Sequence, residues 1–255
     1  RRVRMWWQDQ ADQIFFRPLA FLVMRAEYVL TGWRAAAMHV FSLAWTAAAG
    51  VLVMFLARRL GLGGFWPVLA GLLFVAHPAN ALTTQWIACQ NEQMATVFLL
   101  AGLLAYARYA GWRWNEASAR SGGLGSLLIA AGAVVAAMLC RESGLVFLPL
   151  VVIGDVLLGP VGRRDRVSIY AALVVLIAGY LVVRHVLLGP LTLLGPPYAY
   201  LPSTPGFVRF VIDKLVYYLL GLFAFVPIVG FAGLEEVRAQ PVAFYGSFGV
   251  LVVAW

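Results

Sequence analysis

Apolar runs long enough to cross a lipid bilayer constrain the fold of this chain most strongly. The stretch MHVFSLAWTAAAGVLVMFLA, residues 38–57, contains no Asp, Glu, Lys or Arg. A membrane-spanning helix needs roughly 20 such residues to cross about 30 Å of hydrocarbon. Several further runs are of similar character, and none alternates as the lipid-facing strand of a barrel does. The sequence therefore predicts an all-α membrane protein.

The composition supports a membrane protein and gives no support to nucleic acid as a partner. Of the 255 residues, 63% are hydrophobic and 12% are charged, whereas soluble domains are about half apolar and about a quarter charged. The net charge is +8, but in a membrane protein an excess of Arg is first interpreted as loop topology. The sequence contains no phosphate-binding glycine loop and no zinc-ligand spacing, so it supports neither a nucleotide site nor a zinc site, and we assign no cofactor and no metal ligand.

The apolar runs predict about seven or eight membrane helices. Their expected ranges are 35–57, 65–78, 92–109, 123–140, 144–158, 168–188, 207–230 and an incomplete helix from 242. The second and fifth are short for a crossing. Because the chain starts without Met and stops inside an apolar run, we expect it to be a segment of a longer protein.

The distribution of arginine between the loops predicts the orientation. Three alternate loops are basic, and the loops between them are poor in Lys and Arg. Basic loops face the cytoplasm, so we expect a multi-pass protein of the cell inner membrane. The basic loops carry Arg58 and Arg59, then Arg108, Arg113 and Arg120, then Arg163, Arg164 and Arg166.

This orientation places four segments on the outer side. They are residues 1–34, 77–93, 140–144 and 187–207. Within residues 1–34, charged positions interrupt the apolar pattern, so this part is expected to form an outer loop and an amphipathic helix lying on the membrane or on the bundle. The expected domains are therefore residues 1–34 and a transmembrane bundle of residues 35–255.

Polar residues gather in the outer stretch HPANALTTQWIACQNEQ, residues 77–93. Polar groups at membrane depth need partners or water. Two interpretations follow: a capped and hydrogen-bonded hairpin, or one wall of a site for a phosphate-bearing or sugar substrate. Glu92 would lie in the first turn of its helix, where the helix dipole favours a carboxylate. His77, Asn91 and Glu92 are candidate site residues.

Further charged residues fall on the same side. Arg141 and Glu142 lie in the turn CRESG, Arg184 lies near the outer end of its helix, and Arg17 precedes Pro18. The guanidinium fork matches phosphate, so several converging arginines would suit a lipid-linked phosphate. Alternatively, each arginine pairs with Glu27, Glu92 or Glu142, or extends to lipid headgroups. Cys89 and Cys140 either form a disulfide or pack as free thiols.

Several motifs, in order and spacing, resemble one family. The segments FFRPLAFL, MHVFSLAWTAAAGVLVMFLARRL, LAGLLFVAHPANALTTQWIACQNEQMATVFLL and AMLCRESGLVFLPLVVIGDVLL resemble the membrane part of GT-C-type glycosyltransferases. The likeness is closest to the tetratricopeptide-repeat-linked O-mannosyltransferases and their bacterial relatives, and it covers about residues 15–190. The matching positions are Arg17, Pro18, His39, Ser42, His77, Pro78, Trp86, Asn91, Glu92, Arg141 and Glu142.

The resemblance implies transfer of a sugar from a polyprenyl-phosphate donor to an acceptor on the outer face. In the family, an acidic pair in the first outer loop supplies the catalytic base. Asp9 and Asp12 lie in the corresponding loop but are not adjacent. The candidate catalytic residues are therefore Asp9, Asp12, Glu92 and Glu142. The candidate substrate-binding residues are Arg17, His77, Asn91, Arg141 and Arg184.

Two other functions compete with this interpretation. A noncatalytic membrane subunit would keep the scaffold and pack against partner subunits in a larger complex. A transporter would place ionisable residues in the middle of the membrane, whereas most charges here lie near the predicted helix ends. The expected partners are membrane lipids, a polyprenyl-phosphate sugar if the protein is active, and partner membrane subunits.

Overall fold

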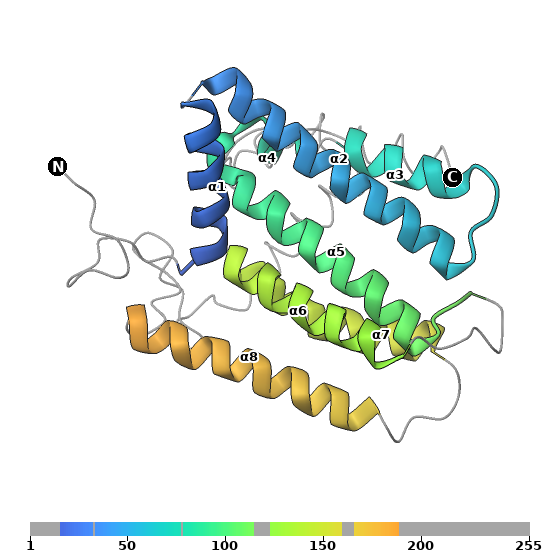
Figure 1. Ribbon diagram of the computed structural model, residues 1–255. Coiled ribbons are helices and arrows are strands. Elements are labelled where there is room, and N and C mark those ends of the chain that lie inside the picture. Colours follow the sequence, from blue (N-terminus) through green and yellow to red (C-terminus); the bar gives the residue numbers. More distant parts are fainter. Residues whose placement is uncertain (1–15, 33, 78, 115–122, 160–165, 189–255) are drawn as a thin grey trace, which may run out of the picture. The chain divides into compact units, whose positions relative to one another are not determined.

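The chain forms helices throughout the residues that the computed structural model describes, which are 16–32, 34–77, 79–114, 123–159 and 166–188 (Figure 1). No strand occurs among them, so the all-α class is confirmed for this part of the chain. The elements are α1 (Pro18–Thr31), α2 (Ala35–Leu60), α3 (Trp66–Ala76), α4 (Ala79–Gln85), the 3₁₀ turn η1 (Ile87–Cys89), α5 (Gln90–Ala110), α6 (Leu124–Cys140), the 3₁₀ turn η2 (Glu142–Val146), α7 (Phe147–Leu158) and α8 (Arg166–Leu188).

These helices agree with the expected ranges to within a few residues. The helices expected at 35–57, 92–109, 123–140 and 168–188 correspond to α2, α5, α6 and α8, and the expected N-terminal helix corresponds to α1. The two segments expected to be short form helices of 11 and 12 residues, α3 and α7. The helices expected at 207–230 and from 242 lie outside the described residues.

The structure divides into two compact units, one of residues 1–76 and 83–190 and one of residues 77–82 and 191–255. In the first unit α5 is central and packs against α2 on one side and α6 on the other (Figure 1). Helix α1 runs across the end of this unit and contacts α2, α5 and α6. It therefore covers the end at which α5 begins and α6 finishes.

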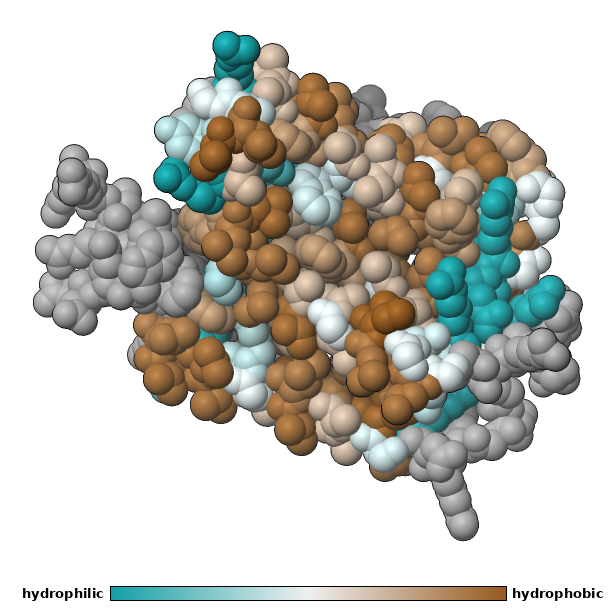
Figure 2. Space-filling view, in the orientation of Figure 1, coloured by the Kyte–Doolittle hydropathy of each residue, from teal (hydrophilic) through white to brown (hydrophobic). Residues whose placement is uncertain are grey.

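The core of the first unit forms around α5. Tyr106 of α5 packs edge-on against Phe147 of α7, and Val134 of α6 is fully buried beside them. By contrast, α2 and α8 expose large apolar side chains; Val175 and Val186 of α8 are 71% and 75% exposed. Apolar surface covers much of the face that Figure 2 shows. Such exposure suits contact with lipid rather than with water.

Two described helices are long and apolar enough to cross a membrane. They are α2 and, in α8, residues Arg166–Leu187, while α3 and α6 are shorter apolar helices. This finding agrees with a membrane protein. The expected number of seven or eight membrane helices stays a prediction.

Glycines in the left-handed conformation end helices α2 and α5. Gly61 closes α2 with φ 105°, and Gly111 closes α5 with φ 70°. Both angles lie in the left-handed region that most side chains avoid. The two glycines stop both helices at the same end of the first unit, next to Arg58, Arg59 and Arg108.

Helices α2 and α3 approach closely through two glycines. A Cβ atom added to Gly71 would lie 2.7 Å from the carbonyl oxygen of Gly50, and one added to Gly50 would collide with Val75. Membrane helices pack closely through such small residues, because lipid supplies little hydrophobic driving force for helix association.

A buried polar seam fixes α1 and α5 on α2. Gln90 Nε2 donates to the Met38 carbonyl oxygen at 2.9 Å and to Ser42 Oγ at 3.1 Å. Trp45 Nε1 donates to Glu27 Oε1 at 3.3 Å. Glu27, Ser42 and Gln90 are all buried. Since unpaired polar groups are costly away from water, these bonds restrict how the three helices can pack.

The seam continues one turn further along α2 and α5. Gln93 Nε2 donates to Thr46 Oγ1 at 2.9 Å, and the hydroxyls of Thr46 and Thr84 are 3.1 Å apart. Several polar side chains of the 77–93 stretch therefore hydrogen-bond to α2 and serve helix packing. The contacts of Thr84, Gln90 and Gln93 therefore agree with the first interpretation of this stretch, a hydrogen-bonded hairpin.

We predict that Gly71→Leu destabilises the protein by about 1–3 kcal/mol, because a larger side chain cannot enter the α2–α3 contact without displacing a helix. Thermal unfolding of the purified protein in detergent measures the effect. Gly132→Leu is the matched control, since nothing lies within 4 Å of a Cβ atom built on Gly132. Equal destabilisation by both substitutions would contradict the close-packing account.

We predict that Glu27→Gln stabilises the protein increasingly as the pH rises. Burial raises the pKa of the Glu27 carboxyl above its ordinary value of 4.5, and hydrogen bonds from Trp45 and Gln90 only partly oppose the shift. The stability that protonation contributes is therefore full below pH 4.5 and is lost as the pH rises through the raised pKa.

Glutamine keeps an acceptor for Trp45 and cannot ionise. The difference between the melting temperatures of the variant and the wild type, measured in detergent, should grow as the pH is raised from acid to alkaline. A difference that stays constant with pH would contradict a buried, proton-retaining Glu27.

Candidate functional site

Five of the residues that the sequence marks as site candidates come together at one end of the first unit. We call this group the charge cluster, and its members are Arg17, Glu92, Arg141, Glu142 and Arg184. Arg17 Nη2 lies 3.2 Å from Glu142 Oε2, and Arg184 Nε lies 4.0 Å from Glu142 Oε1. Arg141 Nη1 forms an ion pair with Glu92 Oε1.

Four separate parts of the fold supply the charge cluster. Arg17 immediately precedes α1, where Pro18 occupies the first helical position that suits proline. Glu92 lies in the first turn of α5, as its place in the sequence predicts. Arg141 and Glu142 occupy the α6–α7 turn, and Arg184 lies near the end of α8.

A close backbone contact sets the α6–α7 turn. Arg141 leaves α6 in an extended conformation, with φ −164° and ψ 148°. A Cβ atom on Gly144 would lie 2.6 Å from the backbone nitrogen of Met138 and 2.9 Å from the carbonyl carbon of Ala137. Only glycine therefore lets η2 fold back onto α6, which carries Glu142 toward Arg17 and Arg184.

The charge cluster is partly buried and carries more positive than negative charge. The side chains of Arg17 and Arg184 are 17% and 9% exposed, whereas those of Glu92, Arg141 and Glu142 are 28–33% exposed. Three guanidinium groups face two carboxylates. Since partial burial strengthens electrostatic interactions, the arrangement can accept an anion, and guanidinium groups match the geometry of phosphate.

The alternative interpretation of the arginines, as partners of nearby glutamates, holds for the contacts within the cluster. Arg17 and Arg184 pair with Glu142, and Arg141 pairs with Glu92. This pairing does not exclude a substrate role, because the same contacts hold several cationic groups in one place. Glu27, the third glutamate considered as a partner, hydrogen-bonds Trp45 instead.

The remaining candidates lie in different surroundings. Asn91 is buried at 5% exposure beside Glu92, and its Oδ1 has no hydrogen-bond partner among the described residues. His77 belongs to the second compact unit, where its Nδ1 accepts a hydrogen bond from the Ala79 amide at 3.1 Å. Asp9 and Asp12 lie outside the described residues.

Both cysteines are free thiols, so the alternative of packed thiols holds. Cys140 is fully buried at the end of α6. Burial raises the pKa of the Cys89 thiol, and the nearby Glu92 carboxylate raises it further. The Cys89 thiol therefore stays protonated near neutral pH and is a weak nucleophile.

A buried network around Asp155 was not predicted. The Asp155 carboxylate accepts hydrogen bonds from Tyr106, Trp112 and Tyr170, each at 2.7 Å, and pairs with Arg166 at 2.7 Å. It joins α5, α7 and α8 at the end of the unit opposite the charge cluster. The sequence did hold a signal for this network. Asp155 is the one charged residue in the apolar run LPLVVIGDVLL, and a charge in such a run needs buried partners.

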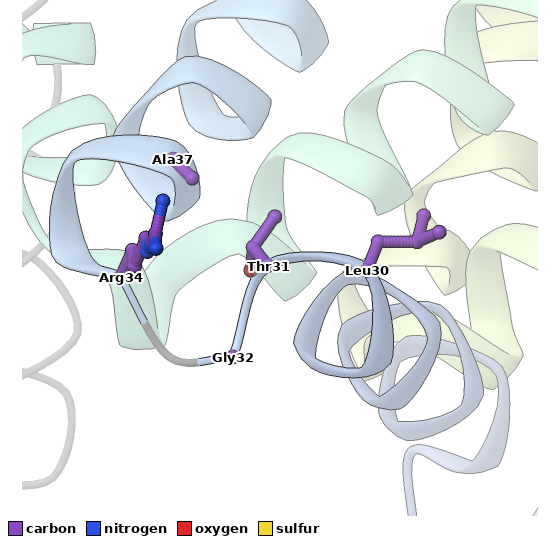
Figure 3. A pocket seen from close by; sticks show the side chains of 5 residues that line it. All are labelled: Leu30, Thr31, Gly32, Arg34 and Ala37. Carbon is purple, nitrogen blue, oxygen red and sulfur yellow. The ribbon is translucent and has the colours of Figure 1, made fainter.

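An open pocket of 530 Å³ lies where α1 turns into α2 (Figure 3). Leu30, Thr31, Gly32, Arg34 and Ala37 line it. Gly32 makes the turn with φ 62°, and its amide donates to the Tyr28 carbonyl oxygen at 2.8 Å. The lining contains none of the candidate site residues, so the charge cluster is the stronger candidate site.

Relatives of the chain come from one group of proteins. The chain is 31% identical over 170 residues to "Protein O-mannosyl-transferase Tmtc2" of Drosophila melanogaster, which covers 66% of this chain and 18% of the relative. It is 27% identical over 173 residues to "Protein O-mannosyl-transferase TMTC2" of Homo sapiens, which covers 64% and 20%. A third relative, "Protein O-mannosyl-transferase Tmtc1" of Drosophila melanogaster, is 30% identical over 158 residues, which covers 62% and 17%.

The matched part is a limited fraction of each relative. The chain spans between 17% and 20% of the length of these three proteins. No protein-family model matches the chain, and no solved structure matches it. Over the matched part of its length, the chain is similar in sequence to the TMTC group of protein O-mannosyl-transferases, as its motifs indicate.

Proposed function

We propose that this protein is a multi-pass membrane glycosyltransferase of the GT-C type in the cell inner membrane. It transfers a sugar, mannose by analogy with the named relatives, from a polyprenyl-phosphate donor to a hydroxyl acceptor on the extracytoplasmic face. The observation that carries the proposal is the charge cluster, in which three arginines from separate parts of the fold meet at one end of an apolar bundle. The similarity to protein O-mannosyl-transferases supports the same chemistry.

The positions of the charges support the proposed orientation. Glu92 lies in the first turn of α5 and Arg108 in its last turn, which separates them by about 24 Å at 1.5 Å per residue. Arg58 and Arg59 end α2 beside Arg108. Basic helix ends favour the cytoplasmic side, so the charge cluster faces outward, and with it the donor phosphate.

The arginines suit the leaving group of the reaction. As the acceptor oxygen bonds to the anomeric carbon, the bond from that carbon to the phosphate oxygen breaks, and its electron pair remains on the phosphate. Arg17, Arg141 and Arg184 would stabilise this developing charge. Their pairing with glutamates positions them before the donor arrives, which avoids reorganisation during the reaction.

A carboxylate must take the proton that the acceptor hydroxyl loses. Asp9, Asp12, Glu92 and Glu142 are the candidates. Both carboxylate oxygens of Glu142 face arginines, whereas only one oxygen of Glu92 does. We therefore assign Glu142 to positioning the arginines, and the base is Asp9, Asp12 or Glu92. Asn91, buried beside Glu92, would contribute to the binding of the sugar. His77, which belongs to the second unit, stays a sequence-based candidate.

A noncatalytic membrane subunit is the second candidate. The observation that favours it is that both carboxylates of the charge cluster already form ion pairs. In such a subunit the cluster would only hold α1 and α8 in place, and the protein would pack against partner subunits without turning over a donor.

The orientation predicts which loops can be labelled from outside intact cells. Ser143, exposed in the α6–α7 turn, and Gly63, exposed after α2, lie at opposite ends of the first unit. In a background that carries Cys89→Ser, with buried Cys140 retained, Ser143→Cys should react with a membrane-impermeant maleimide. Gly63→Cys should react only after the membrane is opened. The reverse pattern would contradict an outward-facing charge cluster.

Activity should depend on the arginines of the charge cluster and not on surface charge in general. The full-length protein in liposomes with polyprenyl-phosphate mannose and an acceptor should transfer mannose. Arg17→Gln should lower kcat/KM by about 10²-fold or more, because it removes a cation facing the leaving phosphate. Release of labelled mannose from the lipid measures the effect.

Arg25→Gln is the matched control, since Arg25 is an exposed arginine of α1 that lies over the Tyr28 ring. Its activity should stay within about twofold of the wild type, as expected for a surface substitution. The glycosyltransferase proposal fails if the folded full-length protein turns over no polyprenyl-phosphate sugar. If that protein is also bound to partner subunits, the result supports the noncatalytic subunit.

A further inference from the structure

Four arginines gather at the end of the first unit opposite the charge cluster. We call this group the arginine patch, and its members are Arg58, Arg59, Arg108 and Arg113. Arg58 and Arg59 lie in the last turn of α2, Arg108 lies in the last turn of α5, and Arg113 follows α5. Arg58, Arg108 and Arg113 are exposed. A strongly hydrophilic area covers this end of the two helices (Figure 2).

Backbone contacts hold the arginine patch together. The Trp114 amide donates to the Leu60 carbonyl oxygen at 2.7 Å, which joins the segment after α5 to the end of α2. Arg59 donates from both Nε and Nη2 to the Ala107 carbonyl oxygen, each at 3.3 Å. The patch is therefore a fixed arrangement shared by two helices.

Among the described residues, Arg58, Arg59 and Arg108 form no ion pair with a carboxylate. Arg59 contacts the Ala107 carbonyl oxygen directly beside Arg108, and Arg58 is its neighbour in the chain, so the positive charges of the three side chains repel one another. Among the described residues, the carboxylate at this end is Asp155, which is 1% exposed and already paired with Arg166.

The ends of the helices compensate only part of this charge. Each helix C-terminus carries roughly half a negative charge, so the ends of α2 and α5 together offer about one negative charge against the three guanidinium groups of Arg58, Arg59 and Arg108. Placing several like charges side by side is unfavourable unless an anion lies among them.

Exposed aromatic residues occur in the segments that follow the arginine patch in the chain. Phe65 and Trp66 begin the α3 segment and are 64% and 66% exposed, and Trp114 is 61% exposed. Large aromatic side chains of this kind prefer the boundary between acyl chains and headgroups. The patch therefore lies at the depth at which lipid phosphates occur when α2 crosses the membrane.

We propose that the arginine patch binds the phosphate headgroup of an anionic membrane phospholipid. The guanidinium groups from the two helix ends contact the headgroup, and the neighbouring aromatic side chains contact the start of its acyl chains. The bound anion relieves repulsion within the patch and ties the end of α2 to the end of α5. This site is separate from the one proposed for sugar transfer.

Binding of phosphatidylglycerol and of phosphatidylcholine to the delipidated full-length protein tests the proposal, with native mass spectrometry as the readout. The wild type should bind phosphatidylglycerol at least tenfold more tightly. Arg58→Gln combined with Arg108→Gln should remove most of this preference, since each arginine near an anionic surface contributes about five- to tenfold. Neither substitution touches the Arg59 contact with Ala107, so the variant should remain folded.

Arg25→Gln combined with Arg34→Gln is the matched control, because it removes two exposed arginines elsewhere in the first unit. This control should keep the lipid preference to within about twofold. Equal binding of both lipids by the wild type would overturn the proposal, as would equal losses in the two double variants. Displacement of phosphatidylglycerol by millimolar inorganic phosphate would also overturn it, because the site would then recognise free phosphate.

Because the readout is lipid binding and not sugar transfer, failure here leaves the proposed function intact. A protein that transfers mannose but shows no lipid preference refutes the arginine patch alone. A protein that prefers phosphatidylglycerol but transfers no sugar refutes the proposed function alone.

Discussion

The ion pairs of Glu142 are the interaction on which the candidate site depends. One carboxylate in the α6–α7 turn contacts Arg17, which precedes α1, and Arg184, near the end of α8. Because breaking a partly buried ion pair leaves an uncompensated charge, the helices are constrained to meet at this point. The position of Glu142 in turn depends on Gly144, where a side chain would collide with the end of α6. A backbone requirement thus determines where three arginines converge.

The same physical conditions organise the rest of the first unit. Polar side chains pair inside it, as in the seam around Gln90 and the network around Asp155, while α2 and α8 present apolar side chains on their surfaces. That distribution suits a protein whose surroundings are lipid, where polar groups find partners within the protein. The two groups of arginines then occupy opposite ends, one facing a proposed lipid-linked donor and one facing proposed lipid headgroups.

The sequence predicted the main helices of the described residues to within a few residues, because the length of an apolar run is a local property. It also placed Glu92 in the first turn of α5 and gathered the charged residues on one side through loop topology. It could not assign partners, because Arg17 and Glu142 are 125 residues apart in the chain. The network around Asp155 was missed for the same reason, although a carboxylate within an apolar run indicates that buried partners exist.

The central claim is that the charge cluster binds the phosphate of a lipid-linked sugar. A cryo-electron microscopy structure of the full-length protein with polyprenyl-phosphate mannose tests it most directly. The account predicts that the phosphate lies within hydrogen-bonding distance of Arg17, Arg141 or Arg184, with the sugar beside Asn91 and Glu92. Density for the phosphate at the opposite end of α5, or a charge cluster closed off by a partner subunit with no donor bound, would contradict it.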